Sequence, residues 1–420
     1  MSYKSYRKIL SAAVAAGALL LAAQAHAEPQ VEVLHWWTSG GEAKAVKALK
    51  EEFEANGGTW VDSPIAGGGG DAAMTALRAR AMAGNPPTAA QVKGPSIQEW
   101  AAEGLLGDLT DVAKAENWAD VLPPLLQDVM KYKGRYVAVP VNIHRVDWIW
   151  ANPAVLAKVG VTAVPKTWDE FNQVADKLQA AGITPLAHGG QPWQDATVFE
   201  VALLGVGGAD FYQKTMVDLD DAALRSDTMV KVFDQMRKLR GYVDPNFPGR
   251  DWNLATAMVM NGEAAFQIMG DWAKGEFLAA DKVPGKDFLC APAPGDGYLL
   301  NTDSFIMFDV KGKDALAGQR LMAKLVMAPR FQETFNLYKG SIPVRLGMDM
   351  SRFDQCAQRS SSDLVATIKA DTLRPSMAHK MAVPDRVVGA ITDVVTAHFN
   401  SDMSSRAAAT RLADSVAAAK

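Results

Sequence analysis

The sequence predicts an α/β fold in which a mostly parallel sheet is covered by helices. Strand and helix patterns alternate between residues 31 and 103, and a strand at 136–142 leads into a second region of the same kind. Such alternation is typical of βαβ units, whose helices pack on the faces of a parallel sheet. The length of 420 residues suits two or three domains.

The first strand, at 31–37, ends in the adjacent tryptophans Trp36 and Trp37, just before the glycine turn Gly40-Gly41. Neighbouring side chains on a strand point to opposite faces, so the two rings cannot both fill one core. At least one ring is therefore expected to face a cleft or solvent, where it offers a flat platform to a ligand. The plainer alternative is one core tryptophan and one surface tryptophan.

The elements that follow are bounded by glycines and capping residues. The helix at 42–56 has apolar residues on one face and ends at Gly57-Gly58. Beyond it we expect, in order, a strand at 59–65, a glycine-rich turn at 67–70, a helix at 72–83 capped by Asp71, a strand at 88–93 and a helix at 96–103.

The second α/β region follows the strand at 136–142. Thr167 and Glu170 form a capping box, and the helix that they start closes at Gly182. Helices dominate to about residue 280, strands are expected at 288–291 and 302–309, and helices end the chain. Because no low-complexity linker separates the regions, we expect strands that cross between lobes, which makes a hinge rather than a flexible tether.

Residues 1–27 have the pattern of a secretory signal. Basic residues precede an apolar stretch at 9–23, and Ala25-His26-Ala27 is an A-x-A cleavage site. The apolar stretch is too short for a permanent membrane anchor, and polar residues follow it at once. No cysteine lies near the cleavage point, which argues against a lipid anchor. We expect a mature chain that starts at Glu28 and is soluble outside the cytoplasm.

Composition narrows the classes of partner. The net charge is −4 and no basic block occurs, which argues against nucleic acid as a partner. The eleven tryptophans favour buried cores together with an aromatic-lined site. The two cysteines, Cys290 and Cys356, can form a disulfide in an oxidising compartment, and two buried thiols are the alternative.

Catalytic and metal signatures are missing from the sequence. It contains no G-x-S-x-G elbow, H-E-x-x-H helix, C-x-x-C pair or Walker loop. The glycine run at 67–70 lacks the Lys-Ser/Thr of a phosphate loop, so we interpret it as a flexible turn. The acidic run at 218–221 lacks the glycine and the distal glutamate of a calcium loop. We therefore predict a protein that is not an enzyme and has no cofactor and no metal site.

The candidate site residues lie where strands give way to helices or turns. In open α/β sheets, ligands bind outside the carboxyl ends of the strands. Each residue alone would more often be a capping or solvated group. The candidates are Trp36, Trp37, Glu42, Lys93, Trp272, Asn301, Asp303, Lys339 and His379.

Four segments, in order along the chain, give the sequence a family resemblance. They are VLHWWTSGGE at 33–42, TWDEF at 167–171 with GITPLA at 182–187, MNGEAAF at 260–266 with GDW at 270–272, and GSIPVR at 340–345. Together they make the chain resemble the extracellular solute-binding proteins of ATP-driven (ABC) sugar importers, in particular the periplasmic glucose/mannose-binding proteins. The resemblance covers essentially all of residues 28–420.

The resemblance implies a two-lobed periplasmic solute-binding fold of the class II type, with a hinge of crossing segments. It implies an N-terminal lobe at 28–141 plus about 295–345 and a C-terminal lobe at 142–294 plus about 346–420.

The resemblance also implies the roles of the candidate residues in a cleft that holds the sugar. Trp36 or Trp37 would stack on the sugar from one lobe and Trp272 from the other. The polar contacts would come from Glu42, Lys93, Asn301, Asp303, Lys339 and His379. The stretch 142–148 varies among relatives, so His144 and Asp147 are left unassigned.

The chemistry of these side chains agrees with the resemblance. A pyranose has an apolar face for tryptophan and hydroxyls that both donate and accept; Glu42 and Asp303 can accept, while Lys93 and Lys339 can donate. This mixture suits a neutral polyol better than a sugar acid. We predict a monomeric periplasmic protein that binds a neutral monosaccharide, glucose in the first place, and delivers it to an inner-membrane ABC permease.

Two alternatives stay open at this point. One is a binder of a disaccharide or a polyol, because larger-sugar binders share the same outline. The other is a periplasmic glycoside hydrolase that would use Glu42 and Asp303 as its carboxylate pair. Such an enzyme needs two carboxyl groups about 5–10 Å apart across the scissile bond.

Overall fold

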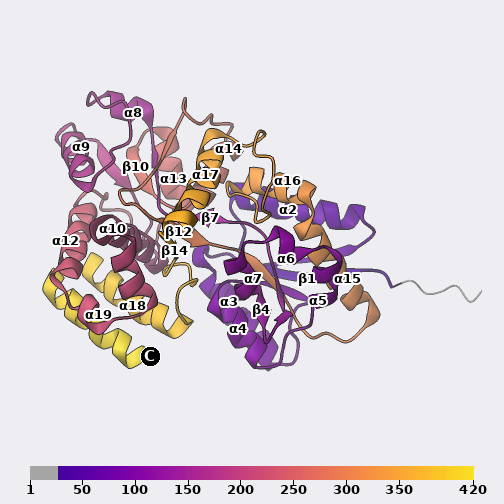
Figure 1. The fold of residues 1–420 in the computed structure, drawn as a ribbon. Coiled ribbons are helices and arrows are strands. Elements are labelled where there is room, and N and C mark those ends of the chain that lie inside the picture. The colour runs from indigo at the N-terminus through magenta and orange to yellow at the C-terminus, as the bar shows by residue number, and fades with distance from the viewer. Residues whose placement is uncertain (1–26) are drawn as a thin grey trace, which may run out of the picture.

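The computed structural model describes residues 27–420 and shows two lobes joined by crossing segments (Figure 1). The predicted signal peptide lies outside the described residues, apart from its last residue, Ala27. Within the described part of the chain, every helix is too short or too polar to cross a membrane.

The first lobe is built on a five-stranded sheet with the order β2-β1-β3-β13-β6. Its strands are β1 (Gln30–His35), β2 (Thr59–Pro64), β3 (Ala89–Val92), β6 (Ala138–Pro140) and β13 (Ser304–Met307). β1 runs parallel to β2 and β3, whereas β13 is antiparallel to both of its neighbours. The predicted parallel sheet is thus correct for this lobe except for β13, which returns to it from late in the chain.

Helices cover the first sheet close to where the sequence predicts them. They include α2 (Gly40–Ala55), α3 (Asp71–Met82), α4 (Pro95–Ala102), α15 (Lys313–Met327) and α16 (Pro329–Lys339). The glycine run forms a short 3₁₀ turn, η1 (Gly68–Gly70), that leads directly into α3. The carboxyl ends of β1 and β3 therefore open toward the N-termini of α2, α3 and α4, which is where ligands bind in open α/β sheets.

The second lobe is built on a mixed four-stranded sheet with the order β11-β8-β10-β9. Its strands are β8 (Trp148–Ala151), β9 (Thr184–Ala187), β10 (Ala264–Ile268) and β11 (Leu289–Pro292). Only β9 and β10 are parallel, because β8 is antiparallel to both β10 and β11. The mostly parallel arrangement that the sequence predicts for the first region therefore does not extend to this sheet, whose strand β8 runs against both of its neighbours.

Helices also surround the second sheet. They include α9 (Trp168–Ala180), α10 (Pro192–Tyr212), α12 (Asp227–Gly241), α13 (Trp252–Asn261), α14 (Trp272–Ala279), α18 (Asp385–Phe399) and α19 (Ser405–Ala419). The predicted capping box is present in part, since the hydroxyl of Thr167 accepts from the Glu170 N–H and the Glu170 carboxylate accepts from the N–H of Lys166.

Between the lobes lies a three-stranded sheet of β7 (His144–Arg145), β12 (Tyr298–Asn301) and β14 (Leu373–Pro375), with β12 in the centre (Figure 1). These strands come from distant parts of the chain, so the connection is a set of crossing segments, as predicted. The residue boundaries of the two lobes remain a prediction. Helix α17 (Gln355–Ala370) contributes Ala357 to the hydrophobic core of the first lobe and Cys356 to that of the second.

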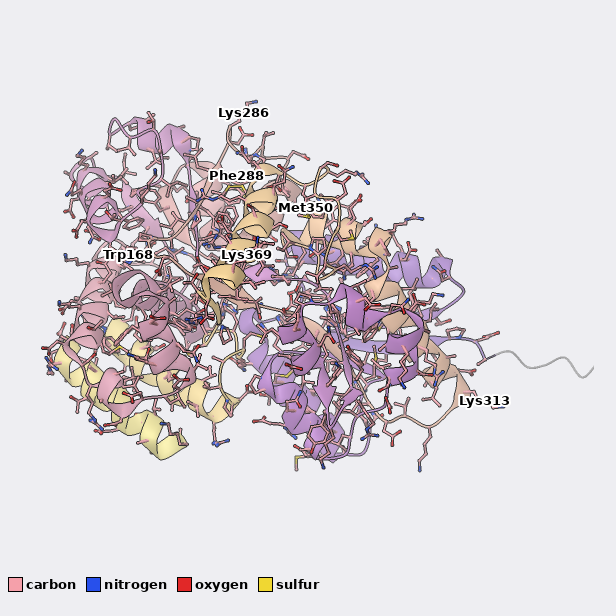
Figure 2. All side chains as sticks on the ribbon, in the orientation of Figure 1. Trp168, Lys286, Phe288, Lys313, Met350 and Lys369 are labelled. Atoms are coloured by element: carbon pink, nitrogen blue, oxygen red, sulfur yellow. A yellow bond between two sulfur atoms is a disulfide. The ribbon has the colours of Figure 1, made fainter. Side chains whose placement is uncertain are left out.

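Each lobe has its own hydrophobic core, and side chains fill both (Figure 2). In the second core, Phe288 stacks on Phe277 with ring centroids 4.3 Å apart. On the surface, Lys286 of the second lobe and Lys313 of the first lobe extend into solvent (Figure 2). The predicted disulfide is present: Cys290 of β11 is bonded to Cys356 of α17.

Candidate ligand-binding pocket

A pocket lies between the lobes. It is lined by Trp36, Trp37, Glu42, Gly68, Gly69, Lys93, His144, Trp193, Trp252, Trp272, Asn301, Asp303, Lys339 and His379. Every residue that the sequence singles out for the site is in this set, although they come from segments spread over most of the chain.

The two tryptophans after β1 have different surroundings. Trp37 is 1% exposed and packs between Phe305 and Phe335, with ring centroids 5.6 and 5.3 Å away. Trp36 is 6% exposed and lies under Gly70, on which a Cβ atom would be 3.0 Å from three atoms of the indole ring. Both rings line the pocket and both belong to the core of the first lobe.

The expectation that these two rings cannot share one core is therefore wrong. It rested on strand alternation, but β1 ends at His35, and residues 36 and 37 lie past its end. The backbone there is held by side chains instead: Trp36 N–H donates to Gln91 Oε1 (3.2 Å) and Trp37 N–H donates to His35 Nδ1 (3.2 Å).

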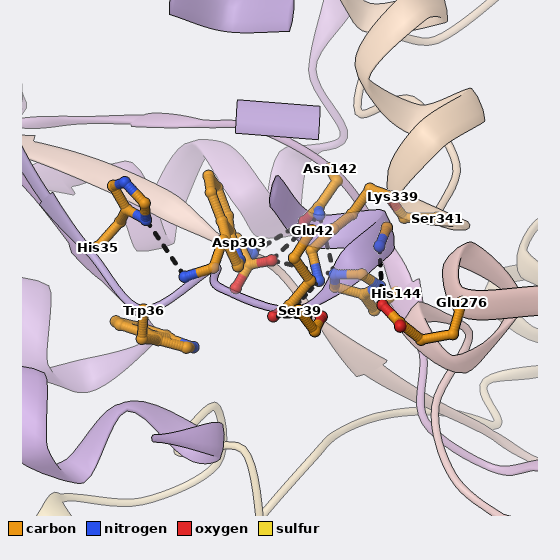
Figure 3. A network of polar contacts seen from close by, with 12 residues as sticks. His35, Trp36, Ser39, Glu42, Asn142, His144, Glu276, Asp303, Lys339 and Ser341 are labelled. Carbon is orange, nitrogen blue, oxygen red and sulfur yellow. Dashed lines mark hydrogen bonds and ion pairs between the residues drawn. The ribbon is translucent and has the colours of Figure 1, made fainter. Parts of the chain in front are cut away.

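Asp303 is the centre of a buried polar network (Figure 3). Its carboxylate accepts hydrogen bonds from Gln91 Nε2 (3.1 Å), Asn142 Nδ2 (3.1 Å) and His144 Nε2 (3.0 Å). Burial alone would raise the pKa of this carboxyl group. The hydrogen bond and charge of His144, with the ammonium groups of Lys339 and Lys93, lower the pKa of Asp303 well below its ordinary value. The group is therefore ionised at every pH at which the protein works.

His144 joins the two lobes through carboxylates on either side. Its Nε2 bonds Asp303 beside β13, and its Nδ1 bonds Asp271, the residue that precedes α14. Burial would lower the pKa of this imidazole, but Asp271 and Asp303 raise it above its ordinary value. The ring is thus an imidazolium that couples the hinge strand β7 to both walls of the pocket.

Glu42 and Lys339 are bonded to each other. Lys339 Nζ donates to Glu42 Oε1 (2.8 Å), and Ser39 Oγ donates to Glu42 Oε2 (3.1 Å) (Figure 3). Glu42 lies in the first turn of α2 and Lys339 is the last residue of α16, so the pair also joins two helices of the first lobe. Because one charge cancels the other, the pair presents polar atoms to the pocket without a net charge.

Lys93 and Asn301 present polar atoms that no other side chain uses. Within residues 27–420, Lys93 Nζ makes no hydrogen bond or ion pair, and it lies 5.1 Å from the ring centroid of Trp36. Burial lowers the pKa of Lys93 most, while Asp303 opposes that shift. The buried Oδ1 of Asn301 is likewise without a partner there. Lys93 Nζ can therefore donate to a ligand and Asn301 Oδ1 can accept from one, and a hydroxyl group can act in either role.

The second lobe contributes mainly aromatic rings. His379 and His144 contact the ring of Trp272 in edge-on arrangements, with centroids 4.8 and 5.2 Å away. His379 Nε2 lies 3.2 Å from the hydroxyl of Thr197. Burial, followed by the charge of Lys93, holds the pKa of His379 well below its ordinary value, so this imidazole is neutral.

The buried carboxyl group of Glu200 holds the loop that carries His379 through hydrogen bonds. Glu200 accepts from the hydroxyl of Ser376 (2.6 Å), from the Met377 N–H (2.8 Å) and from the hydroxyl of Tyr212 (2.8 Å). Burial raises the pKa of Glu200 to about 7, although these hydrogen bonds oppose the shift.

The sequence prediction misses five residues that line the pocket: Gly68, Gly69, His144, Trp193 and Trp252. Trp193 and Trp252 lie in the first turns of α10 and α13, as Trp272 does in α14. The rule that selected Trp272, a ring at the start of a helix after a strand, could have found Trp193, which follows β9. The sequence analysis left His144 unassigned. Only its contacts with Asp271 and Asp303, which the fold brings together, identify it as part of the site.

Comparison with known proteins places the chain among exported binding proteins. Residues 37–317 match the family model described as bacterial extracellular solute-binding protein. A protein named probable sugar-binding periplasmic protein from Rhizobium meliloti (strain 1021) is 50% identical over 416 residues, which cover 99% of this chain and 100% of that one. A protein of the same name from Brucella suis biovar 1 is 50% identical over 419 residues, covering 98% and 99% of the two chains.

A solved structure shares the fold at much lower sequence identity. The bacterial solute receptor AcbH, described with an exclusive preference for β-D-galactopyranose, superposes with a TM-score of 0.79 at 20% identity. The match covers 93% of this chain and 98% of that one.

Proposed function

Since this chain belongs to the family of bacterial extracellular solute-binding proteins, we propose that its pocket binds one neutral monosaccharide, with glucose preferred. The family consists of binding proteins rather than enzymes, and the relatives that are 50% identical to this chain are named periplasmic proteins. We further propose that the protein is a monomer and that it passes the sugar to an ABC permease in the inner membrane. The names of its relatives support a sugar as the ligand.

One observation carries the choice of a neutral polyol. Four charged groups of the pocket are paired within the protein, Glu42 with Lys339 and Asp303 with His144, whereas Lys93 Nζ and Asn301 Oδ1 are without partners among residues 27–420. A ligand that satisfies both atoms must donate and accept. A sugar hydroxyl does both, whereas a carboxylate only accepts and an ammonium group only donates.

The arrangement of rings supports a pyranose. Trp36 on the first lobe and Trp272 on the second lobe both line the pocket. Aromatic faces cover the C–H faces of a sugar ring, while the polar groups at the rim take the hydroxyls. The preference for glucose rests on the family resemblance of the four sequence segments.

We propose the predicted lobes, 28–141 with about 295–345 and 142–294 with about 346–420, as the two bodies that close on the sugar. Contacts between them surround the pocket: Gly41 N–H donates to Glu276 Oε1 (2.8 Å), and Lys380 Nζ pairs with Asp71 Oδ1 (2.6 Å). A ligand that touches both lobes favours the closed form by the difference between its affinities for the closed and open forms.

No observation favours the glycoside hydrolase alternative. A general acid must hold a proton at the working pH. Asp303 is ionised and hydrogen bonded on both oxygens, and Glu42 is engaged by Lys339 and Ser39.

Isothermal titration calorimetry of the mature protein, freed of sugar by partial unfolding and refolding, tests the proposal. The panel is glucose, mannose, galactose, xylose, sorbitol and gluconate. We expect one-to-one binding that is strongest for glucose and weak for gluconate. An absence of heat with every sugar would overturn the proposed function, and a stronger response to sorbitol would replace the sugar by an open-chain polyol.

A further inference from the structure

The glycine run at 67–70 takes part in an unusually close contact between the lobes. Gly67, Gly69 and Gly70 have positive φ angles of 133°, 79° and 88°, which side chains other than glycine rarely adopt. Gly68 is outside that region, so its backbone does not require glycine. At residue 68, it is therefore the space around the backbone that decides whether a side chain fits.

That space is filled by two tryptophans of the second lobe. A Cβ atom on Gly68 would lie 2.7 Å from Cζ2 of Trp193 and 3.0 Å from Cδ1 of Trp252. A Cβ on Gly69 would lie 3.0 Å from Cγ of Trp193. Carbon atoms in proteins pack at about 3.5–4.0 Å, so a methyl group at residue 68 cannot fit while the rings stay where they are.

The two rings are fixed by their own lobe. Trp193 Nε1 donates to Gln191 Oε1 (2.8 Å), and Gln191 Nε2 donates to Asp251 Oδ1 (2.5 Å). The carbonyl group of Trp252 accepts from Gln267 Nε2 (3.0 Å), which holds the backbone that carries the second ring. Both tryptophan rings are buried, at 8% and 5% exposure. The rings therefore present a buried surface against which the glycine turn packs.

On its other side the turn rests on the first lobe, because Gly70 lies against the ring of Trp36. The layers run from Trp36 through the glycine turn to Trp193 and Trp252, and residues from every layer line the pocket. The contact therefore forms part of the pocket wall, and it leaves no room for a side chain between the turn at Gly68 and the two rings.

We propose that the turn at Gly68–Gly70 and the rings of Trp193 and Trp252 form an end wall that limits the ligand to a single sugar ring. Gly68 acts as the specificity-determining residue because its missing side chain lets the wall close. This inference rests on the proposed sugar-binding function and decides between its monosaccharide and disaccharide forms. It makes two demands: the wild-type protein excludes disaccharides, and the fit between Gly68 and Trp193 sets the affinity for the hexose.

The test is a double-mutant cycle measured by calorimetry with glucose, maltose and cellobiose. Wild-type protein should bind glucose and neither disaccharide. Gly68→Ala should weaken glucose binding about tenfold or more, because overpacking by one methyl group opposes closure. In Gly68→Ala combined with Trp193→Ala, the methyl group no longer meets a ring at its nearest contact. The added methyl should then cost at least about threefold less than it does in the wild-type background, where both rings oppose it.

Removal of the wall should widen specificity. Trp193→Ala with Trp252→Ala should gain measurable binding of at least one disaccharide, with its affinity relative to glucose raised about tenfold or more over wild type. The matched control is Gly389→Ala in α18, where nothing lies within 4 Å of the added carbon; it should leave glucose binding unchanged. Sugar-free thermal unfolding of each variant shows whether it folds.

The outcomes separate the two proposals. If wild-type protein binds glucose, but also binds a disaccharide as tightly, the end wall is overturned and the proposed function stands. Unchanged glucose affinity in folded Gly68→Ala protein overturns it as well. If no sugar binds at all, the proposed function falls, and the end wall falls with it. If Gly68→Ala fails to fold, the gain or absence of disaccharide binding in the tryptophan variants decides.

Discussion

The two lobes line the same pocket with different chemistry. The first lobe presents charged groups fixed by one another, as Glu42 is by Lys339, on helices and loops at the carboxyl ends of parallel strands. The second lobe presents the rings of Trp193, Trp252 and Trp272 from the first turns of three helices.

This difference indicates that the two walls contribute to binding in different ways. A preorganised polar wall fixes the orientation of a ligand with little rearrangement, whereas an aromatic wall supplies apolar area when it closes over the ligand. Substitutions in the second wall should therefore change affinity, and they should also lower the stability of the unliganded protein, because the three rings belong to the hydrophobic core of the second lobe. Substitutions in the first wall should also change the stability of the unliganded protein.

The largest effect on affinity is expected from Trp272→Ala in the second wall. Trp272 is buried against His379 and His144, and truncation of an aromatic anchor of this kind costs about 2–4 kcal/mol of binding free energy. Glucose affinity should fall by about 30-fold to 1,000-fold, measured by calorimetry.

Tyr338→Ala is the matched control for Trp272→Ala, because Tyr338 is 45% exposed on α16 and does not line the pocket. It should leave glucose affinity unchanged. A loss of less than about threefold in Trp272→Ala would remove this ring from the ligand contacts and with it the proposed role of the second wall.

In the first wall, Lys93→Met should separate affinity from stability. The hydrogen bonds of a charged group contribute about 1.5–3 kcal/mol, so glucose affinity should fall by roughly 10-fold to 100-fold. The free energy of unfolding without sugar should hold or rise, because the buried ammonium group has no partner among residues 27–420 that compensates its desolvation. Urea denaturation measures the second quantity.

Lys339→Met is the counterpart that sharpens this contrast. It leaves the carboxylate of Glu42 without its ion pair, so the sugar-free protein should lose about 1–3 kcal/mol of stability together with affinity. Equal stability changes in the two methionine variants would mean that Lys93 and Lys339 do not differ in their pairing, contrary to the structure.

The first lobe could be predicted from sequence better than the second. Its helices end at local signals such as Gly57 and begin at residues such as Asp71, and their observed bounds lie close to the expected ones. The place of β13 between β3 and β6, and the reversed direction of β8, depend on pairing between distant segments, which leaves no local pattern.

The site residues, too, divide into those with a local sequence signal and those that depend on contacts between distant segments. Residues at strand ends, such as Lys93, are visible in the sequence because strand ends collect ligands in α/β sheets. His144 acquires its charge only from Asp271 and Asp303, which are more than a hundred residues away along the chain. The close fit of Gly68 with Trp193 is likewise a property of two lobes in contact, so the glycine run had the sequence appearance of a flexible turn.

The support of the second wall should be sensitive to pH through Glu200, whose pKa burial raises to about 7 from an ordinary value of 4.5. The folded protein then holds a proton that the unfolded chain releases between these values. The stability that this group provides is complete below about pH 4.5 and is lost as pH rises through about 7. The loss is on the order of 3 kcal/mol.

Urea denaturation of wild type and Glu200→Gln at pH values from 4.5 to 8 measures this loss. The wild-type free energy of unfolding should decline relative to that of the variant, whose amide can still pair with Ser376 and the loop N–H groups. His398, with a pKa lowered to about 4, acts in the opposite direction and cancels in the difference between the two proteins. Parallel curves would show that Glu200 is ionised throughout.

The smallest effect on affinity is expected from loss of the disulfide, which belongs to neither wall of the pocket. Cys290 and Cys356 join β11 to α17 and do not line the ligand pocket, so neither wall depends on them directly. Replacement of both by serine should lower the free energy of unfolding by about 2–4 kcal/mol, because the unfolded chain regains the freedom of a long loop.

Glucose affinity should change by less than about twofold if α17 keeps its place through its packing and through the ion pair of Asp363 with Arg145 (2.7 Å). Calorimetry and urea denaturation of the same preparation measure both. A large loss of affinity in folded protein would mean that α17, which contributes to both cores, sets the angle between the lobes and needs the disulfide to do so.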